Sequence, residues 1–253
     1  MVKKEKEYQN LNYGSDAVFV GRDSETDEIE YRVESGSIVV IEGKTGSGKT
    51  EMLNYIIDNF KGKGKVAYLD IKGESDKVAA LNFIKENKKR MILLIDNAEE
   101  FSTRDNEKIK YYFDNNIAKS VIFTCSNLDS MNISESLNTR IGNNIIKIEN
   151  LTEEEILRVA EDRIPSEYEI SESIVKEIYE NTPSIQEFLT SLDNLCTLLD
   201  SEDRTKATEK DIEKTKNKEN KKWKPGTKNS DSMTTHLALN QTSSTTVSLV
   251  MIN

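Results

Sequence analysis

The stretch "GKTGSGKT", residues 43–50, fits the pattern G-x-x-x-x-G-K-[ST] without a mismatch. Its glycines let the backbone curl so that N–H groups point inward at phosphate oxygens. Its lysine reaches the β- and γ-phosphates, and its threonine hydroxyl suits a magnesium ion. A chance glycine-rich turn is the alternative, but an expected strand precedes the motif and an expected helix follows it. The sequence therefore predicts a phosphate loop that binds ATP and Mg²⁺ through Gly43, Lys44, Thr45, Gly46, Ser47, Gly48, Lys49 and Thr50.

Apolar runs and helical patterns alternate along the chain around this loop. Short apolar runs, typical of buried strands, occupy residues 37–43, 65–71, 90–96, 120–126 and 143–150. Apolar residues at helical spacing occupy residues 50–60, 75–89 and 105–116. Strands that alternate with helices indicate a parallel sheet covered by helices on both faces. The predicted fold class is therefore α/β, with a doubly wound parallel sheet of five strands.

The third predicted strand runs into "MILLIDNAEEF", residues 91–101. A buried strand of this kind delivers a carboxylate to the magnesium of a nucleotide, so Asp96 and Thr50 are predicted to hold Mg²⁺. Asn97 follows where ATPases that hydrolyse rapidly usually have an acid. An amide can orient the attacking water but cannot accept its proton, so the sequence predicts slow hydrolysis.

Two acids, Glu99 and Glu100, lie just beyond this strand. A turn there can bring one carboxylate back over the γ-phosphate and supply the missing base. The more ordinary interpretation is that both are solvated acids that open the next helix. The candidate catalytic residues of this region are Lys49, Asp96, Asn97 and Glu100.

After residue 150 the pattern changes from strands to helices. A capping box of Thr152 and Glu155 opens the first helical segment, and two amphipathic segments follow. The predicted organisation is an N-terminal extension (1–16), a nucleotide-binding domain (17–150), a small all-α lid domain (151–213) and a disordered low-complexity tail (214–253). The last apolar residues of the tail are too few to form a domain.

The charge of the 253-residue chain is −10 and is unevenly spread. Residues 214–253 hold seven lysines against two acids, a net of +5, so residues 1–213 carry −15. An acidic body argues against broad nonspecific binding of nucleic acid, although a local basic patch remains open. With two distant cysteines, one histidine, no secretory signal and no run of ~20 apolar residues, the sequence predicts a cytoplasmic protein without a membrane span.

Further segments, in their order, resemble the AAA+ ATPases over roughly residues 17–213. "VFVGRDSETDEI" (18–29) resembles the segment that precedes the phosphate-loop strand in archaeal origin-recognition and helicase-loader proteins. The resemblance implies that Val20 and Gly21 help to pack the adenine. "VIFTCSN" resembles the sensor-1 strand, which implies that Asn127 touches the γ-phosphate or orients water. "LNTRI" resembles the arginine-finger position, which implies that Arg140 reaches the nucleotide of a neighbouring subunit.

Three departures from this family qualify the resemblance: Asn97 replaces the expected glutamate, Ser184 stands where a sensor-2 arginine is usual, and no winged-helix domain follows residue 213. The resemblance implies an ATP-binding, Mg²⁺-dependent switch ATPase that assembles with other AAA+ subunits. Its client would be a DNA transaction such as replication initiation, helicase loading or clamp loading, with DNA as a possible partner. A regulatory or scaffolding module with little hydrolysis, or a transposition or signalling ATPase, are the alternatives.

Overall fold

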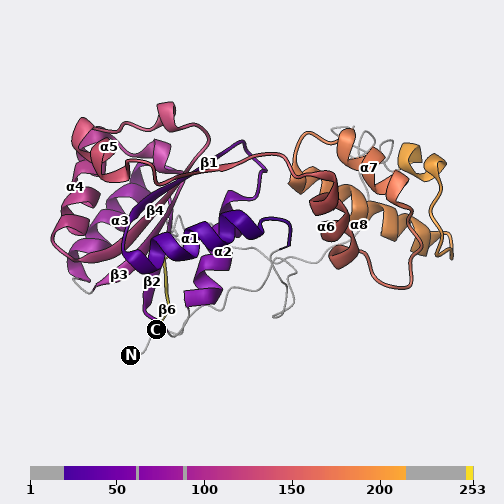
Figure 1. Ribbon diagram of the computed structural model, residues 1–253, viewed down its shortest axis with the longest axis horizontal. Helices are drawn as coiled ribbons and strands as arrows, with labels where there is room; N and C mark the ends of the chain where they lie inside the picture. Colours follow the sequence, from indigo (N-terminus) through magenta and orange to yellow (C-terminus); the bar gives the residue numbers. More distant parts are fainter. Residues whose placement is uncertain (1–19, 61–62, 88–89, 215–248, 253) are drawn as a thin grey trace, which may run out of the picture.

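The computed structural model describes residues 20–60, 63–87, 90–214 and 249–252. A sheet with its helices forms one part, and a group of helices forms another beside it (Figure 1). In chain order the elements are α1 (Asp23–Ser35), β1 (Ile38–Gly43), α2 (Lys49–Phe60), β2 (Lys65–Asp70), α3 (Glu74–Glu86), β3 (Met91–Asp96), η1 (Ala98–Glu100), α4 (Thr103–Asp114), β4 (Ala118–Cys125), η2 (Leu128–Ser130), α5 (Glu135–Ile141), β5 (Ile145–Ile148), α6 (Glu153–Arg163), α7 (Glu172–Glu180), α8 (Ile185–Ser201) and β6 (Leu249–Ile252). None of these helices is long and apolar enough to cross a bilayer.

The sheet has the strand order β5-β1-β4-β3-β2-β6, and β1 to β5 are all parallel. The predicted five-stranded parallel sheet is therefore confirmed. Because the strands run parallel, their carboxyl ends meet at one edge of the sheet, where ligands bind in open α/β folds. The phosphate loop follows β1 and Asp96 ends β3, with β4 lying between those two strands.

A sixth strand, β6, pairs antiparallel with β2, with Val66 opposite Ile252 and Leu69 opposite Leu249. The predicted disorder of residues 214–253 is wrong for residues 249–252, and Lys214 is also ordered. The physical reason is that β2 would otherwise be an edge strand with a row of unpaired backbone groups, which any short apolar segment can pair. The rest of the predicted tail and the predicted extension 1–16 lie outside the described residues.

Helices cover both faces of the sheet (Figure 1). On one face, α1 and α2 bury Ile29, Val33, Met52, Leu53, Ile56 and Phe60 against Val39, Ile41, Ile92, Leu94 and Ile122. On the other, α3, α4 and α5 bury Ala80, Leu81, Ile84, Ile109, Leu137 and Ile141 against Ile38, Val40, Leu93, Ile95, Val121 and Phe123. Successive strand residues thus point to opposite faces, as the period of a strand requires.

Two of these helices, α1 and α5, lie where the sequence pattern predicts none. The apolar stripe of α1 is short, with Ile29 and Val33 set four residues apart in a largely charged segment. Helix α5 spans only 7 residues, which is too few for a helical period to stand out. Both helices owe their place to the sheet face that they cover.

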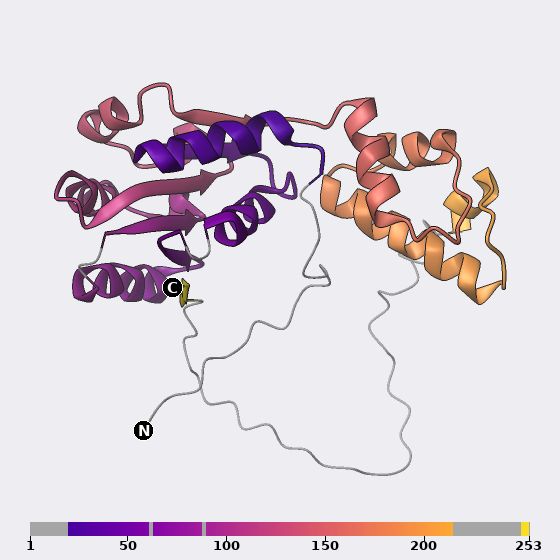
Figure 2. The same cartoon turned by 60° about the horizontal axis from the view of Figure 1, so that its bottom comes forward.

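Helices α6, α7 and α8, together with the helical residues 209–214, surround a core of their own beside the sheet (Figure 2). The predicted capping box is present, because Thr152 Oγ1 accepts from the Glu155 N–H while Glu155 accepts from the Thr152 N–H. Residues 151–214, all described, form helices and a single isolated bridge between Glu169 and Lys206. The predicted all-α character of this region is confirmed.

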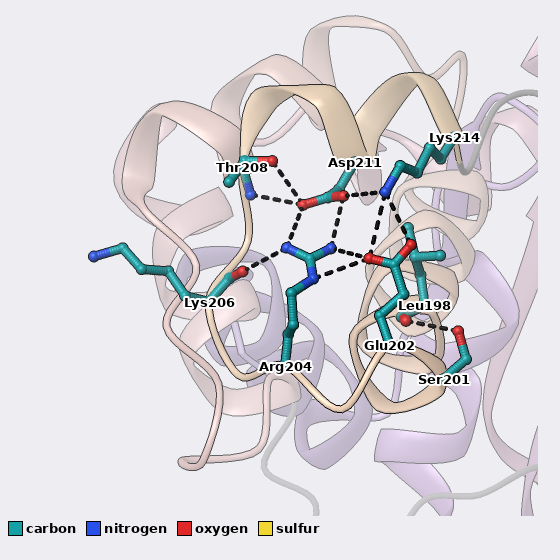
Figure 3. A network of polar contacts seen from close by, with 8 residues as sticks. All are labelled: Leu198, Ser201, Glu202, Arg204, Lys206, Thr208, Asp211 and Lys214. Atoms are coloured by element: carbon teal, nitrogen blue, oxygen red, sulfur yellow. Dashed lines mark hydrogen bonds and ion pairs between the residues drawn. The ribbon is translucent and has the colours of Figure 1, made fainter.

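A polar network fastens the segment that follows α8 (Figure 3). The Arg204 guanidinium donates to both carboxylate oxygens of Asp211, at 2.8 and 3.1 Å, and to Glu202 at 2.9 Å. Lys214 pairs with Glu202 at 2.9 Å and with Asp211 at 3.2 Å. Asp211 is buried, and the adjacent Arg204 holds the pKa of its carboxyl well below the usual range. The network therefore ties residues 202–214 into one unit.

Candidate nucleotide-binding site

The phosphate loop connects β1 to α2 and needs its glycines for two different reasons. Gly46 and Gly48 have φ of 76° and 99°, in the region that side chains disfavour. A β-carbon on Gly43 would lie 2.7 Å from Ser47 Oγ and 3.0 Å from the Ile148 β-carbon. The loop is thus held close to β5 in a conformation that only these glycines permit.

Lys49 reaches back across this loop at the start of α2. Its ammonium donates to the carbonyls of Gly43 at 2.7 Å and Lys44 at 3.0 Å. The hydroxyl oxygen of Ser47 is buried and has no hydrogen-bond partner among the described residues. A helix N-terminus, an ammonium and an unpartnered buried hydroxyl together fit the phosphate groups of a nucleotide.

Thr50 and Asp96, the predicted magnesium ligands, lie in direct contact. The Thr50 hydroxyl donates to Asp96 Oδ2 at 2.8 Å, and the Tyr68 hydroxyl donates to the same oxygen at 3.1 Å. Asp96 is buried, and Thr124 donates to its other carboxylate oxygen. No cluster of three His, Cys, Asp or Glu side chains in the described part of the chain can hold a metal by itself. This oxygen pair fits Mg²⁺, which binds one or two protein oxygens and completes its shell with phosphates and water.

Asn97 turns its side chain away from β4. Its backbone is left-handed, with φ of 59°, and its amide Nδ2 donates to Asp70 Oδ1 at 3.0 Å. Asp70 ends β2 and also pairs with Lys72 at 2.6 Å. Asparagine is among the few residues other than glycine that adopt the left-handed conformation readily. The residue type at position 97 is therefore compatible with this turn. The structure thus directs the Asn97 amide toward the end of β2.

Glu99 lies on the other side, at the end of β4. Its Oε1 accepts from the Ser126 N–H at 3.2 Å and from the Ser126 hydroxyl at 3.0 Å, while its Oε2 is buried without a partner in the described residues. Glu100, one residue on, is exposed. Burial, and then the charges of Glu99 and Glu42, raise the pKa of the Cys125 thiol to about 12. Of the two acids in this turn, the structure brings Glu99 to the sheet edge.

Two of the candidates that came only from the family resemblance, Asn127 and Arg140, are exposed. Asn127 follows β4, and its Oδ1 accepts from the Asp129 N–H at 2.9 Å, which caps η2. Arg140 lies in the last turn of α5, where its Nε pairs with Asp114 at 3.1 Å. Asn127 therefore lies at the same sheet edge as Asp96, while Arg140 points to Asp114 on α4.

The helical region contacts the phosphate loop at the start of α8. A β-carbon on Gly46 would lie 2.7 Å from the Ser184 β-carbon, and the Gln186 N–H donates to the Gly46 carbonyl at 3.4 Å. Ser184 itself caps α8 by accepting from the Glu187 N–H at 3.2 Å. Sequence reasoning noted Ser184 only as a departure, and it missed Gln186, which acts through its backbone.

A second contact joins the helical region to residues 20–22. Gly21 has φ of 86°, and a β-carbon there would lie 3.1 Å from Val159 Cγ2 and 3.5 Å from Leu151 Cδ2. Arg22 is buried and donates to the Glu149 carbonyl at 2.5 Å. This segment, with the partly buried Val20, bridges the sheet part and α6 beside the phosphate loop.

Comparison with known proteins agrees with this geometry. Residues 35–157 match the sequence model of an AAA domain. A RuvB mutant from Thermotoga maritima has a similar structure, with TM-score 0.64, 14% identity, and coverage of 80% of this chain and 71% of that one. Cdc6p from Pyrobaculum aerophilum gives TM-score 0.62, 15% identity, and coverage of 83% and 69%. The replication initiator DnaA bound to AMPPCP and single-stranded DNA gives TM-score 0.59 and 19% identity, with coverage of 81% of this chain and 66% of that one. None of the curated proteins matches the chain in sequence.

The strand order and the phosphate loop together identify an α/β P-loop AAA+ fold with a C-terminal helical region. The predicted resemblance is confirmed at the level of the fold, since structures of Cdc6p and DnaA, as well as RuvB, are among the similar ones. Identities below 20% carry the fold alone, so the activity of those proteins is not transferred on this ground.

Proposed function

We propose that this chain is an ATP-binding switch that hydrolyses ATP slowly and couples its nucleotide state to assembly. The observation that carries the proposal is the contact between Thr50 and Asp96 at 2.8 Å, directly after a phosphate loop that touches the helical region at Ser184. A nucleotide bound there has its phosphates against the loop and the start of α8 close by. Binding can thus shift the position of one part against the other.

Each residue of the site has a distinct role in this proposal. Lys49 compensates the charge of the β- and γ-phosphates, and Thr50 and Asp96 hold Mg²⁺. Asn127 orients water or touches the γ-phosphate at the carboxyl end of β4. Arg140, which is 54% exposed, acts on the nucleotide of a neighbouring subunit after leaving Asp114. Residues 20–21 pack the adenine against α6.

The proposed client is a DNA transaction such as replication initiation or helicase loading. Support comes from the likeness to Cdc6p and to a DnaA structure with AMPPCP and single-stranded DNA. The net charge of −10 argues that any DNA contact is local or made through partners rather than spread over the surface.

A second candidate function is a regulatory module that binds nucleotide with little turnover. Two observations favour it: the Asn97 amide is directed at Asp70, and Ser184 occupies the start of α8 as a helix cap. Under this alternative the contact between loop and helical region responds to nucleotide binding alone.

The two functions separate in one set of measurements on the full chain. Calorimetry with ATP and Mg²⁺ should give binding to wild type, and Lys49→Ala should abolish it because the backbone alone leaves the phosphate charge under-compensated. Steady-state ATP turnover is then measured with and without DNA. The molecular mass of the assembly is measured without nucleotide, with ATP and with ADP, which tests the switch. Slow turnover with ATP-dependent assembly supports it. Binding without turnover indicates the regulatory module, and unchanged affinity in Lys49→Ala contradicts both.

A further inference from the structure

The carboxylate of Glu99 combines features that no other acid of the site shares. Two donors from Ser126, at 3.2 and 3.0 Å, fix its Oε1, and its Oε2 is buried without a hydrogen-bond partner in the described part of the chain. A buried polar oxygen with no partner is costly, and a catalytic role is one of the explanations for such a group in a native structure. The arrangement leaves one fixed carboxylate oxygen whose capacity to accept a proton is unused.

The strand order locates this acceptor. Ser126 directly follows β4, and β4 lies between β3, which ends at Asp96, and β1, which runs into the phosphate loop. Cys125, next to Ser126, feels the opposing charges of Glu99 and Lys49. Glu99 thus lies at the sheet edge between the magnesium ligand and the loop. Because ligands of open α/β sheets bind at this edge, the γ-phosphate of a nucleotide on that loop would face it.

The other acids at this edge are already engaged. Asp96 accepts from Thr50 and Tyr68 on one oxygen and from Thr124 on the other. Glu42 accepts from the Leu128 N–H at 3.0 Å, and its second oxygen lies 3.9 Å from the Lys147 ammonium. A base that is already saturated with donors is a poor acceptor for the proton of water, so Glu99 is the remaining choice.

We propose that Glu99 is the general base of ATP hydrolysis in this chain, replacing the acid that position 97 lacks, with Ser126 as its positioning residue. The inference rests on the proposed function and names the base of that same site. Glu99 Oε2 takes a proton from a water molecule as the water oxygen bonds to the γ-phosphorus. The bond from that phosphorus to the β–γ bridging oxygen breaks, and its electron pair leaves with ADP. Glu99 then releases the proton to solvent.

The test compares Glu99→Gln with wild type in the full chain. Single-turnover hydrolysis with Mg²⁺ should fall by about 100-fold, the lower end of what general-base help contributes. The calorimetric Kd for ATP should stay within about twofold, because the amide keeps the shape of the side chain. The melting temperature of the nucleotide-free protein should stay equal or rise, since the substitution removes a buried charge without a partner. Glu86→Gln, an exposed acid at the end of α3, is the matched control.

Ser126 gives an independent arm. Ser126→Ala removes the hydroxyl donor to Glu99 but keeps the N–H donor, so the single-turnover rate should fall while the Kd for ATP stays unchanged. Ser126→Thr keeps a hydroxyl on the same carbon and should restore most of the rate. A loss in Ser126→Ala that Ser126→Thr does not rescue would count against the positioning role.

Several results would overturn the inference. One is a single-turnover rate in Glu99→Gln that equals the rate in Glu86→Gln. Another is a large loss of rate in Glu100→Gln or Asn97→Asp while Glu99→Gln keeps its rate. A lower melting temperature with weakened ATP binding in Glu99→Gln would assign the residue a structural role. A wild-type chain that binds ATP without any turnover refutes the hydrolysis of the proposed function, and the inference falls with it. The wild-type control thus separates the two failures.

Discussion

Gly46 of the phosphate loop lies so close to Ser184 of the helical region that a β-carbon on Gly46 would stand 2.7 Å from the Ser184 β-carbon and 2.9 Å from its hydroxyl oxygen. The loop glycine is therefore needed twice, for its φ of 76° and for the space that it leaves to α8. Ser184 is thus part of how the phosphate loop and the helical region pack together.

Gly46→Ala should weaken ATP binding and displace α8, because the methyl group adds a clash to the backbone strain. Gly48→Ala is the comparison, since Gly48 also has a positive φ but open space around it. Gly46→Ala should lower the calorimetric affinity for ATP and the melting temperature more than Gly48→Ala does. Adding Ser184→Gly to the Gly46→Ala chain should restore part of both losses. Equal losses at both glycines would show that the contact with Ser184 does not matter.

Thr50→Ala should lower the affinity for ATP in the presence of Mg²⁺ while leaving the affinity in excess chelator unchanged. The reason is that the Thr50 hydroxyl is paired with Asp96 and fits a magnesium ligand rather than a phosphate donor. Thr50→Ser keeps the hydroxyl and should behave like wild type. A Thr50→Ala chain with the same Mg²⁺ dependence as wild type would exclude this residue from the metal site.

Arg140→Ala should leave ATP binding by the single chain nearly unchanged and lower ATP-linked assembly or hydrolysis. The side chain pairs with Asp114 of its own chain and is 54% exposed, so it does not serve the phosphate loop of its own chain. An arginine acting in trans can contribute several orders of magnitude in rate. Mixing Arg140→Ala with Lys49→Ala chains should restore some activity, and full activity of Arg140→Ala alone would contradict the role.

Asp211→Asn should lower the melting temperature near neutral pH by a few degrees, because it removes the charged partner of Arg204 (Figure 3). The pKa of Asp211 is depressed in the folded chain. Its stabilising effect is therefore present above the unfolded pKa of about 3.9 and is lost as pH falls through the lower folded value. The gap between wild type and variant should narrow steadily below about pH 4. A gap that widens on acidification would contradict the assignment.

Deletion of residues 249–253 should speed hydrogen exchange at the β2 amides that face β6, while β3 and β4 stay protected. Four residue pairs join β6 to β2, from Val66 with Ile252 to Leu69 with Leu249. ATP binding should persist, because β2 lies on the far side of β3 from the phosphate loop. Unchanged exchange in residues 65–70 would show that β6 does not pair with β2 in solution.

The sequence by itself determined the elements whose evidence is local. The phosphate loop can be read from "GKTGSGKT" because its chemistry depends on the spacing of neighbouring residues. The five parallel strands can be read because strands buried on both faces are continuous apolar runs. The capping box of Thr152 and Glu155 is likewise contained in four residues.

Only the tertiary structure decided which side chains meet, because contacts between strand ends depend on the order of strands in the sheet. Asn97 and Glu99 are two residues apart, yet one turns to Asp70 at the end of β2 and the other to Ser126 at the end of β4. The contact of Gly46 with Ser184 and the pairing of β6 with β2 join residues far apart in the chain. No local pattern encodes such contacts, since their free energy comes from burial and pairing that exist only after the sheet and the helical region have formed.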